Sequence, residues 1–170
     1  MIILLVGKPS SGKDTFAQYL VDKYGFIRLS FADKLKEEVS TNLNIPLNYF
    51  YDRDLKDTFI DTLGCIPCSL LIQYANKKRS VDPEYFIKKI NINNNKNYVI
   101  SDCRFKNELH YYNNAISIWI ERDNLKDIFD NGELNRNDCQ YIVYNNISPF
   151  DGSNLIRQLK GYGLNRKIIL

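Results

Sequence analysis

The chain has 170 residues, of which 44% are hydrophobic and 25% charged, an ordinary composition for a globular protein with one core. No apolar run approaches the roughly 18–20 residues that cross a bilayer, so we expect no membrane-spanning segment and no membrane partner. The net charge of +3 is modest and fits a protein that binds small anions as well as one that contacts nucleic acid.

Five runs rich in Ile, Val, Tyr or Trp predict strands at residues 2–6, 26–30, 98–101, 115–121 and 139–144. The apolar residues that predict helices are Phe16, Leu20 and Tyr24, then Phe105, Leu109 and Tyr112, then Leu155, Ile156, Leu159 and Tyr162. We expect the last helix to begin with Ser148 as N-cap, Pro149 in its first turn and Asp151 three residues after the cap. Strands that alternate with helices predict an α/β fold with a parallel sheet covered on both faces. Ligands of such sheets bind at the carboxyl ends of the strands.

The segment Gly-Lys-Pro-Ser-Ser-Gly-Lys-Asp-Thr follows the first predicted strand, at residues 7–15. A G-x-x-x-x-G-K pattern between a strand and a helix indicates a phosphate-binding loop. Gly7 and Gly12 allow tight turns that point successive N–H groups at phosphate oxygens. The ammonium of Lys13 can reach the β- and γ-phosphates of a nucleoside triphosphate. The residues expected to bind the nucleotide are Gly7, Ser10, Ser11, Gly12, Lys13, Asp14 and Thr15.

Asp14 stands where this pattern normally has the Ser or Thr that contacts magnesium, and the hydroxyl comes one residue later, at Thr15. A carboxylate beside a triphosphate is repelled unless a divalent cation lies between them, so Asp14 suggests bound Mg²⁺. The alternative is that Asp14 is only a favourable negative charge in the first turn of a helix.

Residues 31–96 predict a long, mostly helical insert without a clear strand. Asp33 could cap its first helix or shape an acceptor pocket, in which Lys36 could face a phosphate. Gln73 could read a nucleobase, because an amide offers both a donor and an acceptor. Gln73 and Arg79 are polar residues on an otherwise apolar helix.

Asp102 directly follows the third predicted strand, where an acid of the Walker B type would hold or orient magnesium. The planar guanidinium of Arg104 suits a pair of phosphate oxygens. Glu108 lies one helical turn further on the same face and could contact a substrate. Alternatively, Arg104 and Glu108 form an exposed i, i+4 pair worth only ~0.3–0.5 kcal/mol.

Arg122 follows the fourth predicted strand, and Arg136 lies at the far end of a short charged segment, residues 122–137. A segment with a basic residue at each end could close over the phosphates as a lid and exclude water. The alternative is a solvated surface loop.

The sequence contains four cysteines: Cys65, Cys68, Cys103 and Cys139. Cys65 and Cys68 have the C-x-x-C spacing of redox and zinc sites, but no second pair exists, and the single histidine, His110, is distant in sequence. We interpret the cysteines as reduced thiols of an intracellular protein. The stretch before residue 7 is too short for a secretion signal and lacks a basic leader, so we expect a cytoplasmic location.

The loop at 7–15, Phe-Ala-Asp-Lys-Leu-Lys at 31–36 and Ser-Asp-Cys-Arg-Phe-Lys-Asn-Glu at 101–108 together resemble the deoxynucleoside monophosphate kinases of phages and large DNA viruses. The resemblance implies the three-layer α/β/α fold of phosphate-loop nucleoside monophosphate kinases. It implies a single domain with a core at 1–30 and 97–170, a five-stranded parallel sheet, an acceptor-binding insert at 31–96 and a lid at 122–137.

The resemblance also implies an activity, namely transfer of the γ-phosphoryl group of ATP to a nucleoside or deoxynucleoside monophosphate with Mg²⁺. The catalytic residues implied are Lys13, Asp102, Arg104, Arg122 and Arg136. The implied magnesium ligands are Asp14, Thr15 and Asp102. Asn145 and Asn146, which follow the fifth strand, would lie near the adenine. The implied acceptor-binding residues are Asp33, Lys36, Gln73, Arg79, Arg104 and Glu108.

The chain also departs from the family pattern. The insert is compact, and the arginine expected upstream of residues 71–73 is missing, which leaves Arg79 or Lys36 as the clamp on the acceptor phosphate. Lys-Asp after the second glycine also occurs in a phosphomevalonate kinase group, and related kinases phosphorylate coenzyme A precursors, so these acceptors stay open. An ATP-binding interaction protein with slow ATPase activity is the alternative from another class. We do not expect nucleic acid as a partner, and the oligomeric state stays open, with a homodimer among the options.

Overall fold

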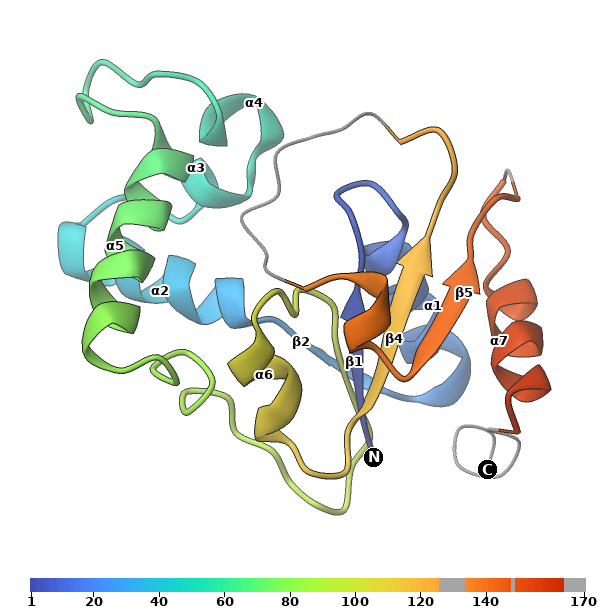
Figure 1. Cartoon of the computed structure of the whole chain (residues 1–170). Helices are drawn as coiled ribbons and strands as arrows, with labels where there is room; N and C mark the ends of the chain where they lie inside the picture. The colour runs from blue at the N-terminus through green and yellow to red at the C-terminus, as the bar shows by residue number, and fades with distance from the viewer. Residues whose placement is uncertain (126–133, 148, 164–170) are drawn as a thin grey trace. The chain divides into compact units, whose positions relative to one another are not determined.

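The computed structural model describes residues 1–125, 134–147 and 149–163. Five parallel strands form one sheet in the order β2-β3-β1-β4-β5 (Figure 1). The strands are β1 (Ile2–Val6), β2 (Ile27–Leu29), β3 (Tyr98–Ile100), β4 (Ile116–Glu121) and β5 (Tyr141–Tyr144). The expected α/β fold with five parallel strands is therefore confirmed, and each expected strand overlaps an observed one.

The central strand, β1, explains why the sheet forms around an apolar run. It pairs with β3 on one side, where Ile2 is opposite Tyr98, and with β4 on the other, where Ile3 is opposite Ile116. Residues 3–6 are almost completely buried. A strand covered on both faces needs a continuous apolar run instead of an alternating one, and residues 2–6 supply it.

The α-helices that the structure describes in the sheet unit are α1 (Lys13–Tyr24), α6 (Lys106–Tyr111) and α7 (Gly152–Gly161). Buried side chains of α1 and α7 pack with one face of the sheet, including Phe16, Leu20 and Leu155. The connection β1–α1–β2 and the connection β3–α6–β4 cross the sheet in opposite directions. Because such connections are right-handed, α1 and α6 cover opposite faces.

The start of α7 differs from the expectation. Asp151 is the N-cap, since its Oδ1 accepts a hydrogen bond from the backbone N of Ser153 at 2.9 Å, and the helix begins at Gly152. Pro149 therefore precedes the helix, and Ser148 lies outside the described residues. A Cβ added at Gly152 would meet ring carbons of Tyr19 in α1. Asp and Ser are equally good N-caps, so capping preference alone does not say where α7 begins. The close packing of Gly152 against Tyr19 favours the start at Gly152.

Residues 31–91 form a second compact unit. Its helices are α2 (Phe31–Leu43), α3 (Asn48–Tyr51), α4 (Arg53–Lys56) and α5 (Pro67–Val81). The expected insert ran to residue 96. Residues after 91 belong to the sheet unit because, for example, the carbonyl of Asn97 accepts a hydrogen bond from the N of Ile27 at 2.8 Å.

Glu38 of α2 is the polar centre of this second unit. The hydroxyls of Tyr74 and Tyr85 each donate to its Oε1 at 2.7 Å, and Nζ of Lys89 lies 2.8 Å from Oε2. Burial alone would raise the pKa of Glu38, but the bonds from Lys89, Tyr74, Tyr85 and Lys78 outweigh burial and lower it to about 2. Glu38 is therefore ionised at neutral pH and joins α2, α5 and the segment after α5.

Candidate active site

The segment between β1 and α1 has the backbone of a tight loop. Gly7, Ser10 and Gly12 all have positive φ angles, of 146°, 64° and 100°. A Cβ at Gly7 would lie 2.5 Å from the carbonyl oxygen of Ile120, and a Cβ at Gly12 would meet Nδ2 of Asn145. The two glycines are therefore required by conformation and by close approach to the ends of β4 and β5.

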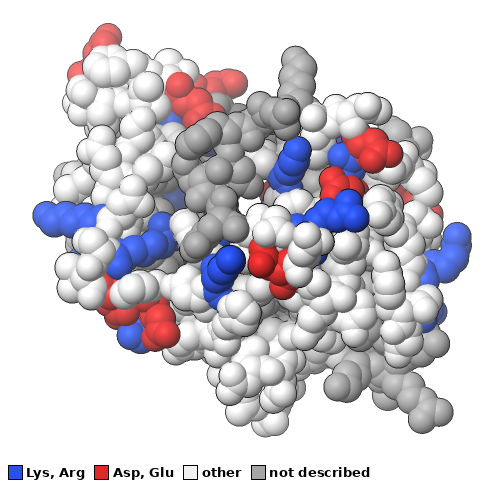
Figure 2. All heavy atoms as spheres, in the orientation of Figure 1, with Lys and Arg blue, Asp and Glu red and all other residues white. Residues whose placement is uncertain are grey.

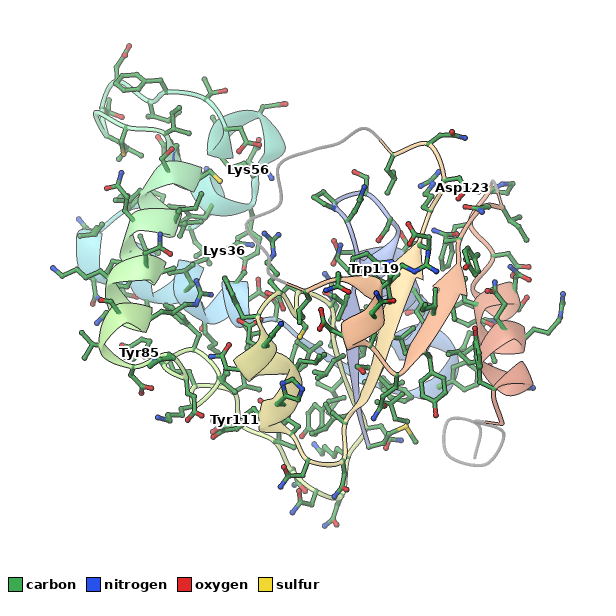
Figure 3. The ribbon with its side chains drawn as sticks, viewed as in Figure 1. Lys36, Lys56, Tyr85, Tyr111, Trp119 and Asp123 are labelled. Atoms are coloured by element: carbon green, nitrogen blue, oxygen red, sulfur yellow. The ribbon has the colours of Figure 1, made fainter. Side chains whose placement is uncertain are left out.

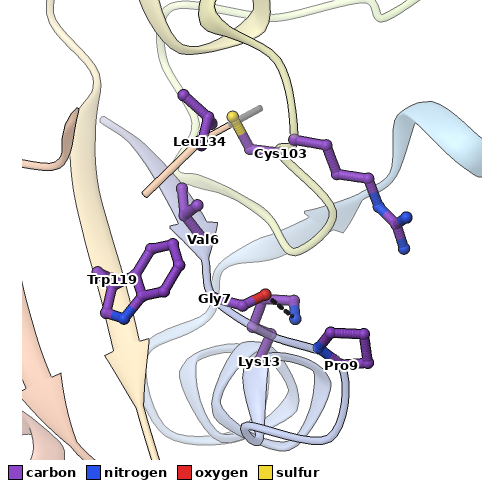
Figure 4. Close-up of a pocket in the computed structure, with 8 residues that line it drawn as sticks. Val6, Gly7, Pro9, Lys13, Cys103, Trp119 and Leu134 are labelled. Atoms are coloured by element: carbon purple, nitrogen blue, oxygen red, sulfur yellow. Dashed lines mark hydrogen bonds between the residues drawn. The ribbon is translucent and has the colours of Figure 1, made fainter. Parts of the chain in front are cut away.

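Lys13 folds back over this loop. Its Nζ donates to the carbonyl oxygen of Gly7 at 2.7 Å (Figure 4) and to that of Lys8 at 2.8 Å. The positive charge thus lies at the amino end of α1, where the helix dipole also favours an anion. Phosphate binding by the loop and its lysine stays a prediction.

Asn145 stabilises the loop through a hydrogen bond to its backbone. Its Nδ2 donates to the carbonyl oxygen of Ser11 at 2.8 Å, its backbone N donates to the carbonyl of Glu121, and it is only 5% exposed. This contact gives the buried side chain a structural role, whereas the resemblance implied a position near adenine. An asparagine after a strand carries no sequence signal for such a contact.

Asn146, the next residue, joins the ends of β4 and β5. Its Nδ2 donates to Oδ2 of Asp123 at 2.6 Å, and the N of Asp123 donates to Oδ1 of Asn146 at 2.9 Å. Asp123 follows β4 beyond Trp119 (Figure 3). Asn146 is exposed at this edge, and its proximity to a base stays a prediction.

Of the two expected magnesium carboxylates, Asp14 lies in the first turn of α1 and Asp102 lies just after β3. Oδ1 of Asp14 accepts hydrogen bonds from Oγ of Ser101 at 2.9 Å and from Nη2 of Arg28 at 2.6 Å. Oδ2 of Asp102 accepts a hydrogen bond from Oγ of Ser30 at 2.9 Å. Both carboxylates are thus oriented by side chains that the sequence did not indicate, namely Ser30, Arg28 and Ser101.

Carboxylate and hydroxyl oxygens are of the kind that Mg²⁺ takes as ligands. Within the described residues there is no group of three or more His, Cys, Asp or Glu side chains that could hold a metal ion. Mg²⁺ characteristically takes one or two carboxylates, keeps several waters and uses substrate phosphates as ligands. Asp14, with a side chain that is 73% exposed, and the exposed hydroxyl of Thr15 are accessible oxygen ligands of that kind.

A hollow beside the loop brings together residues from distant parts of the sheet unit. Arg104 lines it together with Gly7 and Lys13, as the sequence led us to expect. Trp119 of β4, the only tryptophan of the chain, also lines it (Figure 4). Cys103 is a further lining residue. Because burial raises the pKa of its thiol, the thiol is uncharged at neutral pH and does not act as a nucleophile.

Glu108 is not the exposed residue that the alternative interpretation assumed. The side chain is buried, with 3% exposure, and its Oε2 accepts hydrogen bonds from the backbone N of Arg104 at 2.8 Å and of Phe105 at 3.1 Å. Glu108 therefore fixes the start of α6 and the backbone that carries Arg104. Its contact with a substrate stays a prediction.

The two expected lid arginines differ in what the structure shows. Nη1 of Arg122 donates to the carbonyl of Ser10 at 3.3 Å, so this guanidinium lies at the loop. Arg136 begins the short helix η1 (Arg136–Asp138) and is exposed. Residues 126–133 of the expected lid lie outside the described residues.

The remaining expected substrate residues belong to the unit of residues 31–91. The hydroxyl of Tyr51 donates to Oδ1 of Asp33 at 2.8 Å, and Nζ of Lys36 lies 3.9 Å from the centre of the Tyr51 ring. Burial, and then this bond to Asp33, raise the pKa of Tyr51, so the phenol stays protonated. Arg79 lies over the ring of Phe86, at 5.3 Å, and Gln73 is exposed on α5.

The surface charge is mixed. On the face drawn in Figure 2, basic and acidic side chains are interspersed. No helix among residues 1–125, 134–147 and 149–163 is both long and apolar enough to cross a membrane.

Comparison with known proteins gives partial matches. A putative deoxynucleotide monophosphate kinase of Acanthamoeba polyphaga mimivirus is 39% identical over 77 residues, which are 44% of this chain and 39% of that protein. Human adenylate kinase isoenzyme 1 is 50% identical over 40 residues, 24% of this chain and 21% of that protein. These relatives are kinases. Over part of its length, the chain is therefore similar to proteins named as kinases.

Two limits apply to these matches. The chain spans well under half the length of the curated relatives that it matches, and no protein-family model matches it. Among solved structures, a dephospho-CoA kinase from Campylobacter jejuni aligns with 14% identity and a TM-score of 0.47, covering 98% of this chain and 97% of that one.

Proposed function

We propose that this chain transfers the γ-phosphoryl group of ATP to a nucleoside or deoxynucleoside 5′-monophosphate and gives the diphosphate. The observation that carries the proposal is the shared hollow of the loop, Lys13 and Arg104, beside the carboxylates of Asp14 and Asp102. The names of the relatives, adenylate kinase and putative deoxynucleotide monophosphate kinase, support this acceptor class.

The proposed roles follow from where each charge lies. The N–H groups of residues 7–15 hold the β- and γ-phosphates, and Lys13 exchanges its two carbonyl contacts for phosphate oxygens. Arg104, from the hollow, and Arg122, from the loop rim, neutralise charge on the phosphoryl group as it moves. Such transfer needs positioning and positive charge more than covalent help.

Mg²⁺ would be held by Asp14, Thr15 and Asp102, and it would supply a bridge between phosphate oxygens that offsets their charge. In the helical unit, we propose that Asp33, Lys36, Gln73 and Arg79 bind the acceptor. Arg136, with the segment before it, would complete the lid. The proposed setting is the cytoplasm, or the host cytoplasm for a viral protein.

The decisive experiment is a coupled ADP-release assay with ATP, Mg²⁺ and a panel of ribo- and deoxyribonucleoside monophosphates. We expect at least one of them to accelerate ADP release strongly. The panel includes phosphomevalonate and dephospho-CoA, because Lys13 followed by Asp14 also fits kinases of such acceptors. Acceleration by one of these alone would replace the nucleotide acceptor, and slow ATPase activity that no acceptor changes would refute the kinase.

Two substitutions test the assigned roles. Lys13→Ala should abolish turnover with the fold intact, whereas Lys23→Ala, at the other end of α1, should not affect it. Arg104→Ala should lower kcat and kcat/KM together, by about 10²-fold to 10³-fold, if Arg104 acts mainly in the transition state. An unchanged kcat would remove Arg104 from catalysis. Arg157→Ala, an exposed arginine of α7, is the matched control.

A further inference from the structure

Arg28 is a residue that neither the motif nor the resemblance indicates, and it makes the shortest contact of the Asp14 carboxylate. It lies in the middle of the edge strand β2, and its Nη2 is 2.6 Å from Oδ1 of Asp14. The same oxygen accepts the hydrogen bond from Ser101, at the end of β3. Asp14 is thereby tied to two strands from the first turn of α1.

This ion pair is too exposed to matter much for folding. The side chains of Arg28 and Asp14 are 39% and 73% exposed, and pairs of this kind add little to stability. The position of the ion pair is more informative than its contribution to stability. Asp14 follows Lys13 directly, so its negative charge lies beside the place where the phosphates of a nucleotide would bind.

A carboxylate at that place affects metal-free and metal-bound nucleotides differently. Without a divalent cation, Asp14 repels the phosphates unless another positive charge compensates it, and Arg28 is that charge. With a divalent cation, the metal itself compensates Asp14, and Arg28 and the metal compete for one carboxylate.

We propose that Arg28 is a positioning residue that holds and neutralises Asp14, and so sets how strongly nucleotide binding depends on Mg²⁺. The inference rests on the proposed function, because it takes residues 7–15 as the nucleotide site. It explains why a phosphate loop tolerates Asp after its lysine: the chain carries its own counter-charge on β2.

The experiment measures ADP affinity by calorimetry, with excess EDTA and with saturating Mg²⁺, for the wild type and for Arg28→Gln. We expect Arg28→Gln to weaken ADP binding about 5- to 20-fold in EDTA and less than about 3-fold with Mg²⁺, so that the Mg²⁺ dependence grows. In the Asp14→Asn background, where Arg28 and the metal no longer compete for a carboxylate, Arg28→Gln should weaken ADP binding by the same factor in EDTA and with Mg²⁺. Arg157→Gln is the matched control, and circular dichroism checks the fold of each variant.

The outcomes are distinguishable. An equal loss with and without Mg²⁺ when Asp14 is present, or a difference between EDTA and Mg²⁺ that persists in the Asp14→Asn background, would overturn the role of Arg28 and leave the kinase proposal standing. A raised KM for the acceptor with unchanged Mg²⁺ dependence would instead make Arg28 an acceptor contact, which also overturns it. A wild-type chain that binds no ADP would overturn both proposals.

Discussion

Replacing Asn145 by Ala tests whether the hydrogen bond of Asn145 to Ser11 stabilises the loop. The substitution removes the donor of the hydrogen bond to the carbonyl of Ser11 and leaves that buried acceptor without its 2.8 Å partner. It also removes the group against which Gly12 packs, so residues 10–12 lose their support at the end of β5. We expect the loop of the free protein to sample shapes that do not bind phosphate.

The size of the effect follows from that single bond. Leaving a buried acceptor unsatisfied costs about 1–3 kcal/mol. If the whole of this free energy lowers the population of the loop conformation that binds phosphate, nucleotide affinity falls by between about 5-fold and about 150-fold. Any part that appears as global destabilisation lowers the free energy of unfolding instead, so both quantities must be measured.

The assay follows the fluorescence of Trp119, which lines the hollow next to the loop, during titration with ATP, GTP and inorganic triphosphate. Because Asn145 acts on the phosphate loop, all three ligands should lose affinity by the same factor. Gln18→Ala, which removes an exposed hydrogen bond to Asp22 within α1, is the control and should change affinity little. A loss confined to ATP, with triphosphate unaffected, would show that Asn145 reads adenine and refute this reasoning.

Two further predictions concern stability. Because the pKa of Glu38 lies at about 2, below its ordinary value near 4.5, its contribution of about 3 kcal/mol is present above pH 5 and is lost as the pH falls toward 2. Urea unfolding at pH 2–7 should therefore show a flatter pH dependence for Glu38→Gln, and an unchanged one for the exposed control Glu37→Gln. Gly152→Ala should lower the free energy of unfolding by about 1–3 kcal/mol, because its Cβ meets the ring of Tyr19. Gly161→Ala in the same helix meets nothing within 4 Å and should be neutral or slightly stabilising; equal effects at the two glycines would contradict the packing argument.

The fold was predictable because its signals are local. Each strand is a short apolar run, and the helix after the loop shows its buried face in the spacing of Phe16 and Leu20. The start of α7 was not predictable, since Asp151 and Ser148 are equivalent caps by type. A tertiary contact, Gly152 against Tyr19, decides between them.

In the candidate site, too, the local features were predictable and the long-range contacts were not. Gly7, Gly12 and Lys13 could be recognised because their spacing is contiguous and the backbone geometry follows from it. The position of Asn145 near adenine stays a prediction, but its bond to Ser11 was not foreseen, because that contact joins residues 134 positions apart. The role of Ser101 was missed for the same reason, since it lies 87 positions from Asp14. Contacts of that kind depend on strand order, which one sequence without the structure does not show.

The central place of β1 has a consequence for how the chain is made. Residues 2–6 leave the ribosome well before their partners in β3 and β4, which begin at Tyr98 and Ile116. Until those partners are made, the most apolar strand of the sheet has two unpaired edges, with residues 31–91, a separate compact unit, lying between β1 and these partners in sequence. The sheet can therefore close only after residue 98 has been made, and release of the chain before that point would leave β1 free to aggregate.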